Sequence, residues 1–201
     1  FSNPHGLDEE EHYTSAYDIC QIARELINKY GDLILPITSR YDDYVREGTE
    51  KQFWLVNTNK LVKYIEGIDG LKTGWTNEAG YCLTATIHKN NIRFIAVAMG
   101  AETAKERNND VVNMLNYGVS NYELVPLVKK GEIVKTIEDI KTMPNIYHLV
   151  TKEEVAILKK KNEQIGDVKT EIVDEQLKVF IDNELYRVVE LESMEEIEKA
   201  N

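Results

Sequence analysis

The most informative segment of the chain reads Gly67-Ile68-Asp69-Gly70-Leu71-Lys72-Thr73-Gly74-Trp75-Thr76 and continues into Ala79-Gly80-Tyr81-Cys82-Leu83. After it come two runs rich in β-branched and aromatic residues, 80–88 and 92–100, with Lys89-Asn90-Asn91 between them. A polar turn between two β-prone runs predicts an antiparallel hairpin. With the preceding segment as a further strand, the sequence predicts a three-stranded antiparallel sheet.

A helix is predicted ahead of this sheet. Thr14 or Ser15 can cap its first turn, and Asp18 stands three residues after Ser15 as a capping-box partner. Apolar residues then recur at helical spacing, at Ala16, Ile19, Cys20, Ala23, Leu26, Ile27 and Tyr30. Gly31 is expected to end the helix. Residues 32–64 mix short apolar and polar pieces and predict no definite element.

A second helix is predicted at residues 104–117, after the hairpin. Thr103 is its expected N-cap, and Gly118 its expected end. The side facing the core is expected to carry Val111, Val112, Leu115 and Val119. The helices and the sheet together predict a first domain over residues 1–121.

The sequence changes character near Tyr122. Short β-prone runs recur between charged turns, at residues 132–136, 146–150, 155–158, 168–173, 177–181 and 185–191. Spacing of this kind predicts a small all-β domain over residues 122–201, and Asp182-Asn183 is expected to form a hairpin turn. Residues 192–199 form an acidic tail that is expected to be helical. The predicted fold class is therefore α+β.

Composition excludes several classes of function. The net charge of −11 argues against binding to nucleic acid, whose phosphates need clustered Lys and Arg. The four His residues show no metal-ligand spacing, and no cofactor motif is present. Cys20 and Cys82 each fall at an apolar position, which favours buried free thiols over a disulfide. No apolar run approaches the roughly 20 residues that span a bilayer.

From Phe1 to about Leu124 the chain resembles the D-alanyl-D-alanine carboxypeptidases among the low-molecular-mass penicillin-binding proteins. The matching segments are residues 3–7, 13–18, 57–61, 67–83, the hairpin up to Gly100, and Arg107. Enzymes of this kind use a Ser-x-x-Lys, a Ser-x-Asn and a Lys-Thr-Gly element. Only the third is present here, because no Ser of this chain has Lys three residues later.

The resemblance implies a role for each of five residues. Lys72 would hold positive charge beside the nucleophile, and the Thr73 hydroxyl would donate to the substrate carboxylate. Gly74, without a Cβ, would let the substrate backbone approach, and the Trp75 N–H would be one of two oxyanion donors. Arg107 would bind the terminal carboxylate. A solvated helix face is the alternative for Arg107, and the Trp75 ring is expected to be a cleft wall.

The resemblance implies the C-terminal part of a penicillin-binding transpeptidase-like α/β domain, followed by a small all-β domain. The expected function is that of a serine-type D-Ala-D-Ala carboxypeptidase, with nucleophile and base upstream of Phe1, so that the chain alone is inactive. Expected partners are peptidoglycan stem peptides and β-lactam antibiotics, without a cofactor or metal. The expected location is the cell envelope, with membrane contact only through a segment outside this chain. A β-lactamase-related protein and a non-catalytic envelope-binding module remain alternatives.

Overall fold

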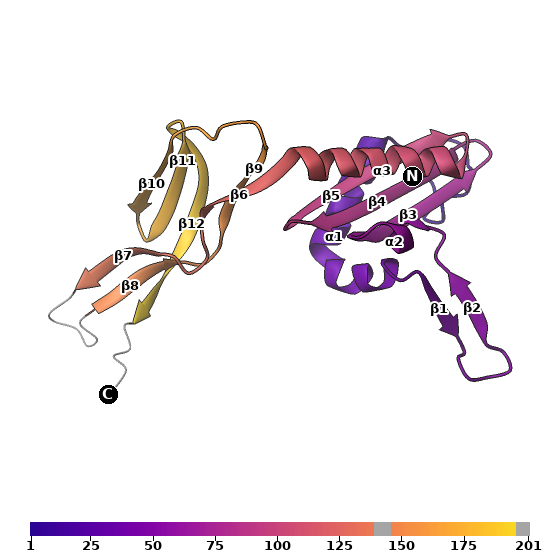
Figure 1. Cartoon of the computed structure of the whole chain (residues 1–201), viewed down its shortest axis with the longest axis horizontal. Helices are drawn as coiled ribbons and strands as arrows, with labels where there is room; N and C mark the ends of the chain where they lie inside the picture. The colour runs from indigo at the N-terminus through magenta and orange to yellow at the C-terminus, as the bar shows by residue number, and fades with distance from the viewer. Residues whose placement is uncertain (139–145, 196–201) are drawn as a thin grey trace. The chain divides into compact units, whose positions relative to one another are not determined.

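The computed structural model describes residues 1–138 and 146–195 and divides the chain after Asn121 into two compact units (Figure 1). The first unit, Phe1–Asn121, contains α1 (Ala16–Thr38), β1 (Asp42–Val45), β2 (Phe53–Val56), α2 (Leu61–Tyr64), β3 (Ile68–Thr76), β4 (Gly80–Lys89), β5 (Ile92–Ala101) and α3 (Ala104–Asn121). Helices and antiparallel strands are thus mixed in one unit, and the α+β fold class is confirmed.

The predicted three-stranded sheet is confirmed, with the order β3-β4-β5 and antiparallel pairing throughout. Asn90 and Asn91 join β4 to β5 with φ of 54° and 61°. A two-residue turn with positive φ at both positions matches the right-handed twist of the strands it connects, and Asn tolerates this conformation well. The turn chemistry therefore fixes the register, in which Lys89 pairs with Ile92.

Helix α3 packs on one face of this sheet. Its buried residues recur at helical spacing: Arg107, Val111, Leu115 and Gly118. Val111 and Leu115 join a core cluster with alternate residues of β4, namely Leu83, Ala85 and Ile87. The predicted N-cap is confirmed, since the amide of Glu106 donates to the Thr103 hydroxyl over 3.1 Å.

Gly118 does not end helix α3, and that prediction is wrong. The helix continues to Asn121, and Gly118 is buried within it. A Cβ added at Gly118 would lie 2.8 Å from Cδ1 of the Phe94 ring on β5. The glycine is therefore there because helix and strand approach closely, and a close approach leaves no signal in the sequence of the helix alone.

Helix α1 also differs from the prediction at its end. The Ser15 hydroxyl caps it by accepting from the Asp18 amide, as expected. The backbone leaves helical geometry at Tyr30, with φ of −134° and ψ of 17°, but the helix does not end there. A second helical segment carries it past Gly31 to Thr38. The glycine therefore marks a kink rather than an end.

Residues 32–64 contain elements that the sequence did not predict. Strands β1 and β2 form a two-stranded hairpin with Asp42 opposite Val56, and the short helix α2 follows. Most side chains of the hairpin are exposed, so its strands lack the alternation of buried and exposed residues by which a half-buried strand is recognised.

The second unit begins at Tyr122 and is all-β in its described residues. It contains β6 (Tyr122–Val128), β7 (Ile133–Glu138), β8 (Ile146–Thr151), β9 (Val155–Lys160), β10 (Val168–Val173), β11 (Gln176–Ile181) and β12 (Glu184–Glu195). Strands β10-β11-β12-β8-β7 form one antiparallel sheet, and β6 pairs with β9. Asp182 and Asn183, with φ of 52° and 66°, form the predicted turn before β12.

One strand of this unit is missing from the prediction, and one prediction for this unit is wrong. Strand β6 was not predicted. The acidic tail is not helical where it is described, because β12 continues to Glu195 and pairs with β8, Leu191 lying opposite Thr151. The remainder of the predicted tail, residues 196–199, lies outside the described residues.

Candidate active site

The Lys-Thr-Gly segment lies on β3, at the edge of the three-stranded sheet. Neighbouring side chains cover the first half of this edge. The Thr38 hydroxyl donates to the Asp69 carbonyl over 2.6 Å, and the Asn59 amide nitrogen donates to the Gly70 carbonyl over 2.9 Å. Both contacts precede Lys72. Among the described residues no strand pairs with the outer side of β3, so its second half can accept an extended ligand.

Lys72 is exposed, and its Nζ donates to the carbonyl oxygen of Thr73. It forms no ion pair with any described carboxylate. The ammonium therefore stands at the open edge of the strand without a counterion from the described chain. A cation in this state is available to an anionic ligand.

The Thr73 hydroxyl has a partner that the sequence did not reveal. It lies 2.7 Å from the hydroxyl of Thr58, and either oxygen can be the donor. Thr58 belongs to the matching segment 57–61, in which the Asn57 side chain holds the carbonyls of Thr38 and Arg40. The sequence marked Thr58 only as a residue of this matching segment. It does not show which hydroxyl the Thr58 side chain faces.

Gly74 lies in regular pairing opposite Cys82, and the only shift of register on β3 is earlier, between Ile68 and Gly70. Gly74 is therefore not a bulge glycine. A Cβ at this position would meet only the Cβ of Cys82, at 3.8 Å, which is ordinary contact. Nothing in the described chain crowds Gly74, so the space above it is open. Cys82 and Cys20 are free thiols, as predicted, but each is half-buried rather than buried.

Arg107 is 6% exposed, so the alternative of a solvated helix face is wrong. Its guanidinium donates to the side-chain oxygen of Asn108, at 2.9 Å from Nη2, and to the carbonyl of Cys82, at 3.4 Å from Nη1. Because Cys82 pairs with Gly74, the guanidinium lies beside the Lys-Thr-Gly strand. Burial lowers the pKa of the Arg107 guanidinium. Arg107 has no carboxylate partner among the described residues, and a buried cation of this kind favours an anionic ligand.

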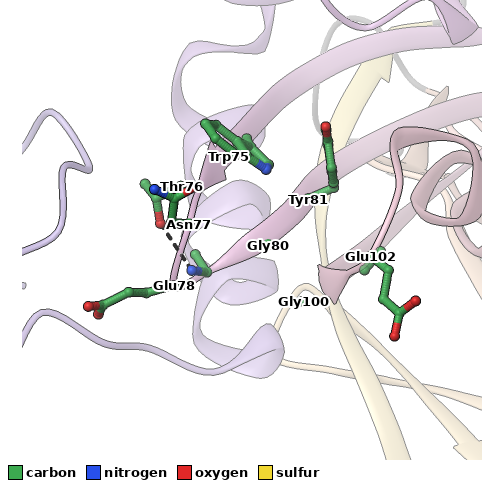
Figure 2. A pocket seen from close by; sticks show the side chains of 10 residues that line it. Trp75, Thr76, Asn77, Glu78, Gly80, Tyr81, Gly100 and Glu102 are labelled. Carbon is green, nitrogen blue, oxygen red and sulfur yellow. Dashed lines mark hydrogen bonds between the residues drawn. The ribbon is translucent and has the colours of Figure 1, made fainter.

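A pocket of about 340 Å³ opens where β3 ends (Figure 2). Its lining is Trp75, Thr76, Asn77, Glu78, Ala79, Gly80, Tyr81, Gly100, Ala101 and Glu102. The Trp75 and Tyr81 rings form one side, with centroids 5.9 Å apart and ring planes at 43°. The Trp75 side chain is thus a wall of a cleft, as expected, and it remains 56% exposed. The sequence did not single out this pocket.

A strand edge that carries Lys-Thr-Gly next to a buried arginine is the arrangement expected of a penicillin-recognising acyl-transferase. The sequence model of the D-alanyl-D-alanine carboxypeptidase family, peptidase family S11, matches residues 1–103, about half of the chain. The chain belongs to this family. Among its curated relatives is the D-alanyl-D-alanine carboxypeptidase DacF of Bacillus subtilis, 51% identical over 172 residues.

Solved structures agree with the sequence comparison. Penicillin-binding protein 5 of Haemophilus influenzae superposes with a TM-score of 0.66 and 26% identity, over 96% of this chain and 59% of that one. Penicillin-binding protein D2 of Listeria monocytogenes, solved in a cefotaxime-bound form, matches with a TM-score of 0.50 and 33% identity, over 57% and 45% of the two chains. The alignment with the Bacillus relative covers 86% of this chain but 44% of that protein, so the chain spans less than half of its relative.

No group of three or more His, Cys, Asp or Glu side chains in the described part of the chain is placed to hold a metal ion. No described helix is both long and apolar enough to cross a membrane.

Proposed function

We propose that the complete protein is a serine-type D-Ala-D-Ala carboxypeptidase of the cell envelope. It removes the terminal D-alanine of peptidoglycan stem peptides through an acyl-enzyme, and β-lactams acylate the same site. The observation that carries this proposal is a pair of cations without described counterions: Lys72 lies within the Lys-Thr-Gly strand, and Arg107 is buried next to Cys82, which pairs with Gly74. A substrate that ends in a carboxylate is the complementary ligand.

Each residue has a distinct part in the reaction. Thr73 donates its hydroxyl proton to the substrate carboxylate, and Arg107 binds that carboxylate with a charge-assisted hydrogen bond. The substrate backbone lies over Gly74, where no Cβ keeps it away. The scissile carbonyl then faces the Trp75 N–H, which stabilises the oxyanion as the serine attacks. The Lys72 ammonium stabilises developing negative charge and keeps the neighbouring base deprotonated.

The nucleophilic serine and its lysine base come from a part of the protein outside this sequence. Two observations support this assignment. No serine of the chain is followed by lysine three residues later, and the chain spans 44% of its Bacillus relative. Membrane contact is likewise assigned to a segment outside this sequence.

Intact-mass analysis after incubation with a labelled penicillin tests the proposal. The complete protein should gain one stoichiometric adduct, whereas the 201-residue chain should gain none because it has no activated nucleophile. An adduct on the 201-residue chain would contradict the assignment of the nucleophile.

The same experiment, combined with an assay of D-alanine release from a D-Ala-D-Ala peptide, separates the alternatives. A β-lactamase-related enzyme would release the penicilloyl group rapidly and leave a D-Ala-D-Ala peptide intact, whereas the proposed carboxypeptidase would hold the adduct and release D-alanine. A non-catalytic envelope module would do neither.

A further inference from the structure

A loop at residues 1–12 is closed by its own hydrogen bonds. The Asn3 side chain accepts from the Gly6 amide over 2.8 Å, and the Ser2 amide donates to Nδ1 of His12 over 2.9 Å. The second contact joins the two ends of the loop. The loop therefore has a defined shape although residues 1–12 contain no helix or strand.

Asp8 joins this loop to the end of β3. Its carboxylate accepts from the Thr76 hydroxyl over 2.7 Å, although the two residues are 68 positions apart in the sequence. The Thr76 oxygen in turn accepts from the Ala79 amide over 3.0 Å, the contact shown by the dashed line in Figure 2. A hydroxyl has one proton, and Asp8 takes it. The last residue of β3 is thus held to the loop on one side and to the following turn on the other.

Strand β3 needs such contacts because no described strand pairs with its outer side. Side chains from other segments support this edge instead. Thr38 and Asn59 hold carbonyls in the first half of the strand, and Asp8 holds its last residue. The Lys-Thr-Gly segment lies between these supports, where the substrate is proposed to bind.

The support at Thr76 lies one residue from the proposed oxyanion donor, the N–H of Trp75. Consecutive Cα atoms are held 3.8 Å apart by the chain, so a displacement of Thr76 also moves Trp75. An oxyanion donor acts only when it lies about 2.7–3.1 Å from the developing charge. The Trp75 side chain is 56% exposed, so packing of its ring gives the backbone little support. The position of this N–H therefore depends on the contact between Asp8 and Thr76.

We propose that Asp8 is a positioning residue for acyl transfer: its carboxylate fixes Thr76 and, through Thr76, the oxyanion donor at Trp75. This inference rests on the function proposed above. Asp8 carries out no step of the reaction, because the Thr76 hydroxyl occupies its carboxylate. Its effect is that the Trp75 N–H is already in place when the scissile carbonyl arrives, as preorganised stabilisation requires.

Asp8→Ala in the complete protein tests the inference with a D-Ala-D-Ala peptide. The value of kcat should fall about tenfold, the size expected when one hydrogen bond to a charged group is lost. The value of KM should stay the same, because the contacts proposed for the substrate carboxylate, at Thr73 and Arg107, are unchanged. An interaction that matters only in the transition state lowers kcat and kcat/KM equally.

Two further variants assign the effect to the hydrogen bond. Asp8→Asn keeps an oxygen that can accept from Thr76 and should recover most of the rate. Glu10→Ala is the matched control, since it removes an exposed carboxylate of the same loop that has no partner among the described side chains. It should keep the original kcat. Thermal unfolding midpoints show whether each variant is folded.

A double variant and a spectrum separate positioning from a merely structural role. Asp8→Ala/Thr76→Val should lose no more than the larger of the two single losses, because both changes break the same contact. The infrared band of a ¹³C-labelled penicilloyl ester carbonyl reports the oxyanion hydrogen bonds directly. Weaker donation from Trp75 should move this band to higher frequency in Asp8→Ala and leave it in place in Glu10→Ala.

Several outcomes would overturn the inference. They are an Asp8→Ala protein with the original kcat and carbonyl band, a loss confined to KM, an equal loss in Glu10→Ala, and single losses that multiply in the double variant. If Asp8→Ala does not fold, Thr76→Val gives the same comparison from the other side of the contact. An unaltered protein that neither forms a penicillin adduct nor releases D-alanine would overturn the proposed function instead.

Discussion

At the scale of single residues, the candidate site depends on which of two threonine hydroxyls donates the hydrogen bond between them. Thr58 and Thr73 share one hydrogen bond, and each hydroxyl has one proton to donate. If Thr58 donates to Thr73, the Thr73 proton is free to point at a substrate carboxylate. Thr58 would thus position the Thr73 proton without touching the substrate.

Thr58→Val should lower kcat/KM of the complete protein for both peptide and penicillin. Valine has nearly the same shape but no donor, so the Thr73 hydroxyl loses its fixed orientation. The loss of one hydrogen bond, about 1 kcal/mol, corresponds to roughly fivefold. Steady-state hydrolysis and penicillin acylation rates measure it. Thr58→Ser keeps the hydroxyl and should stay near the original rates, and equal damage in both variants would make Thr58 a packing residue.

Arg107→Ala should impair peptide hydrolysis more than acylation by penicillin. Penicillin presents its carboxylate to Thr73 from a rigid bicycle, so it depends less on a second contact. Loss of one hydrogen bond to a charged group, about 2 kcal/mol, corresponds to roughly thirtyfold on the peptide. Second-order rate constants for peptide hydrolysis and for penicillin acylation, measured in the original protein and in Arg107→Ala, give the loss in each reaction.

Because Arg107 is buried, the comparison needs a variant that keeps the charge. Arg107→Lys retains the cation and loses only the planar fork, and should fall between the original protein and Arg107→Ala on the peptide. If both variants lose equal factors in the rate constants for peptide and for penicillin, Arg107 is a structural support between α3 and β4.

At the scale of elements, the sequence correctly predicted the features that depend on residues close together in the chain. The Asn90-Asn91 turn, the Thr103 cap and the order β3-β4-β5 follow from residue types and short spacings, and the structure confirms them. Gly31 and Gly118 were both interpreted as helix ends, and both interpretations failed. A glycine has no side chain to indicate whether the chain turns, kinks or is approached by a neighbour, and only the tertiary structure separates these cases.

Gly118→Ala tests the close approach of α3 to β5. The new Cβ would lie 2.8 Å from the Phe94 ring, so the helix or the ring must move. Overpacking of this kind costs about 1–3 kcal/mol, which outweighs the roughly 1 kcal/mol that alanine gains over glycine in a helix. The denaturation midpoint should fall accordingly.

A control on the same helix separates packing from helix propensity. Asn113→Ala changes an exposed position of α3 and should leave the midpoint equal or slightly raised. Adding Phe94→Leu to Gly118→Ala should recover part of the lost stability. A Gly118→Ala protein more stable than the original would show that the ring yields without cost.

At the scale of the whole molecule, residues 1–138 and 146–195 form two separate hydrophobic cores. One joins α3 to β3, β4 and β5, and the other lies within the all-β unit, around Val179 and Val189. No residue belongs to both clusters. The all-β unit therefore has a hydrophobic core of its own.

Residues 122–201 expressed alone should unfold cooperatively on heating. Their core contains fully buried Val179 and Val189, and the five-stranded sheet needs no strand from the first unit. Far-UV circular dichroism during a thermal scan measures the transition. A broad, non-cooperative loss of signal would show that the all-β unit depends on the first unit.

Much of the candidate site was visible in the sequence because it lies on one strand. Lys72, Thr73, Gly74 and Trp75 are consecutive in the sequence. Arg107 was assigned only through the resemblance to the carboxypeptidase family. Thr58 was not assigned a role. Its importance comes from a contact between separate segments, the hydroxyl pair with Thr73.

The open edge of β3 has a consequence for antibiotic resistance. The oxyanion donor proposed at position 75 is a main-chain N–H, which every amino acid except proline supplies. Replacing the Trp75 side chain therefore cannot delete this donor, and a cell under β-lactam selection gains little from most substitutions there. We expect tolerated resistance mutations to alter the walls around the strand, while the hydrogen bonds of its backbone stay the same for drug and substrate.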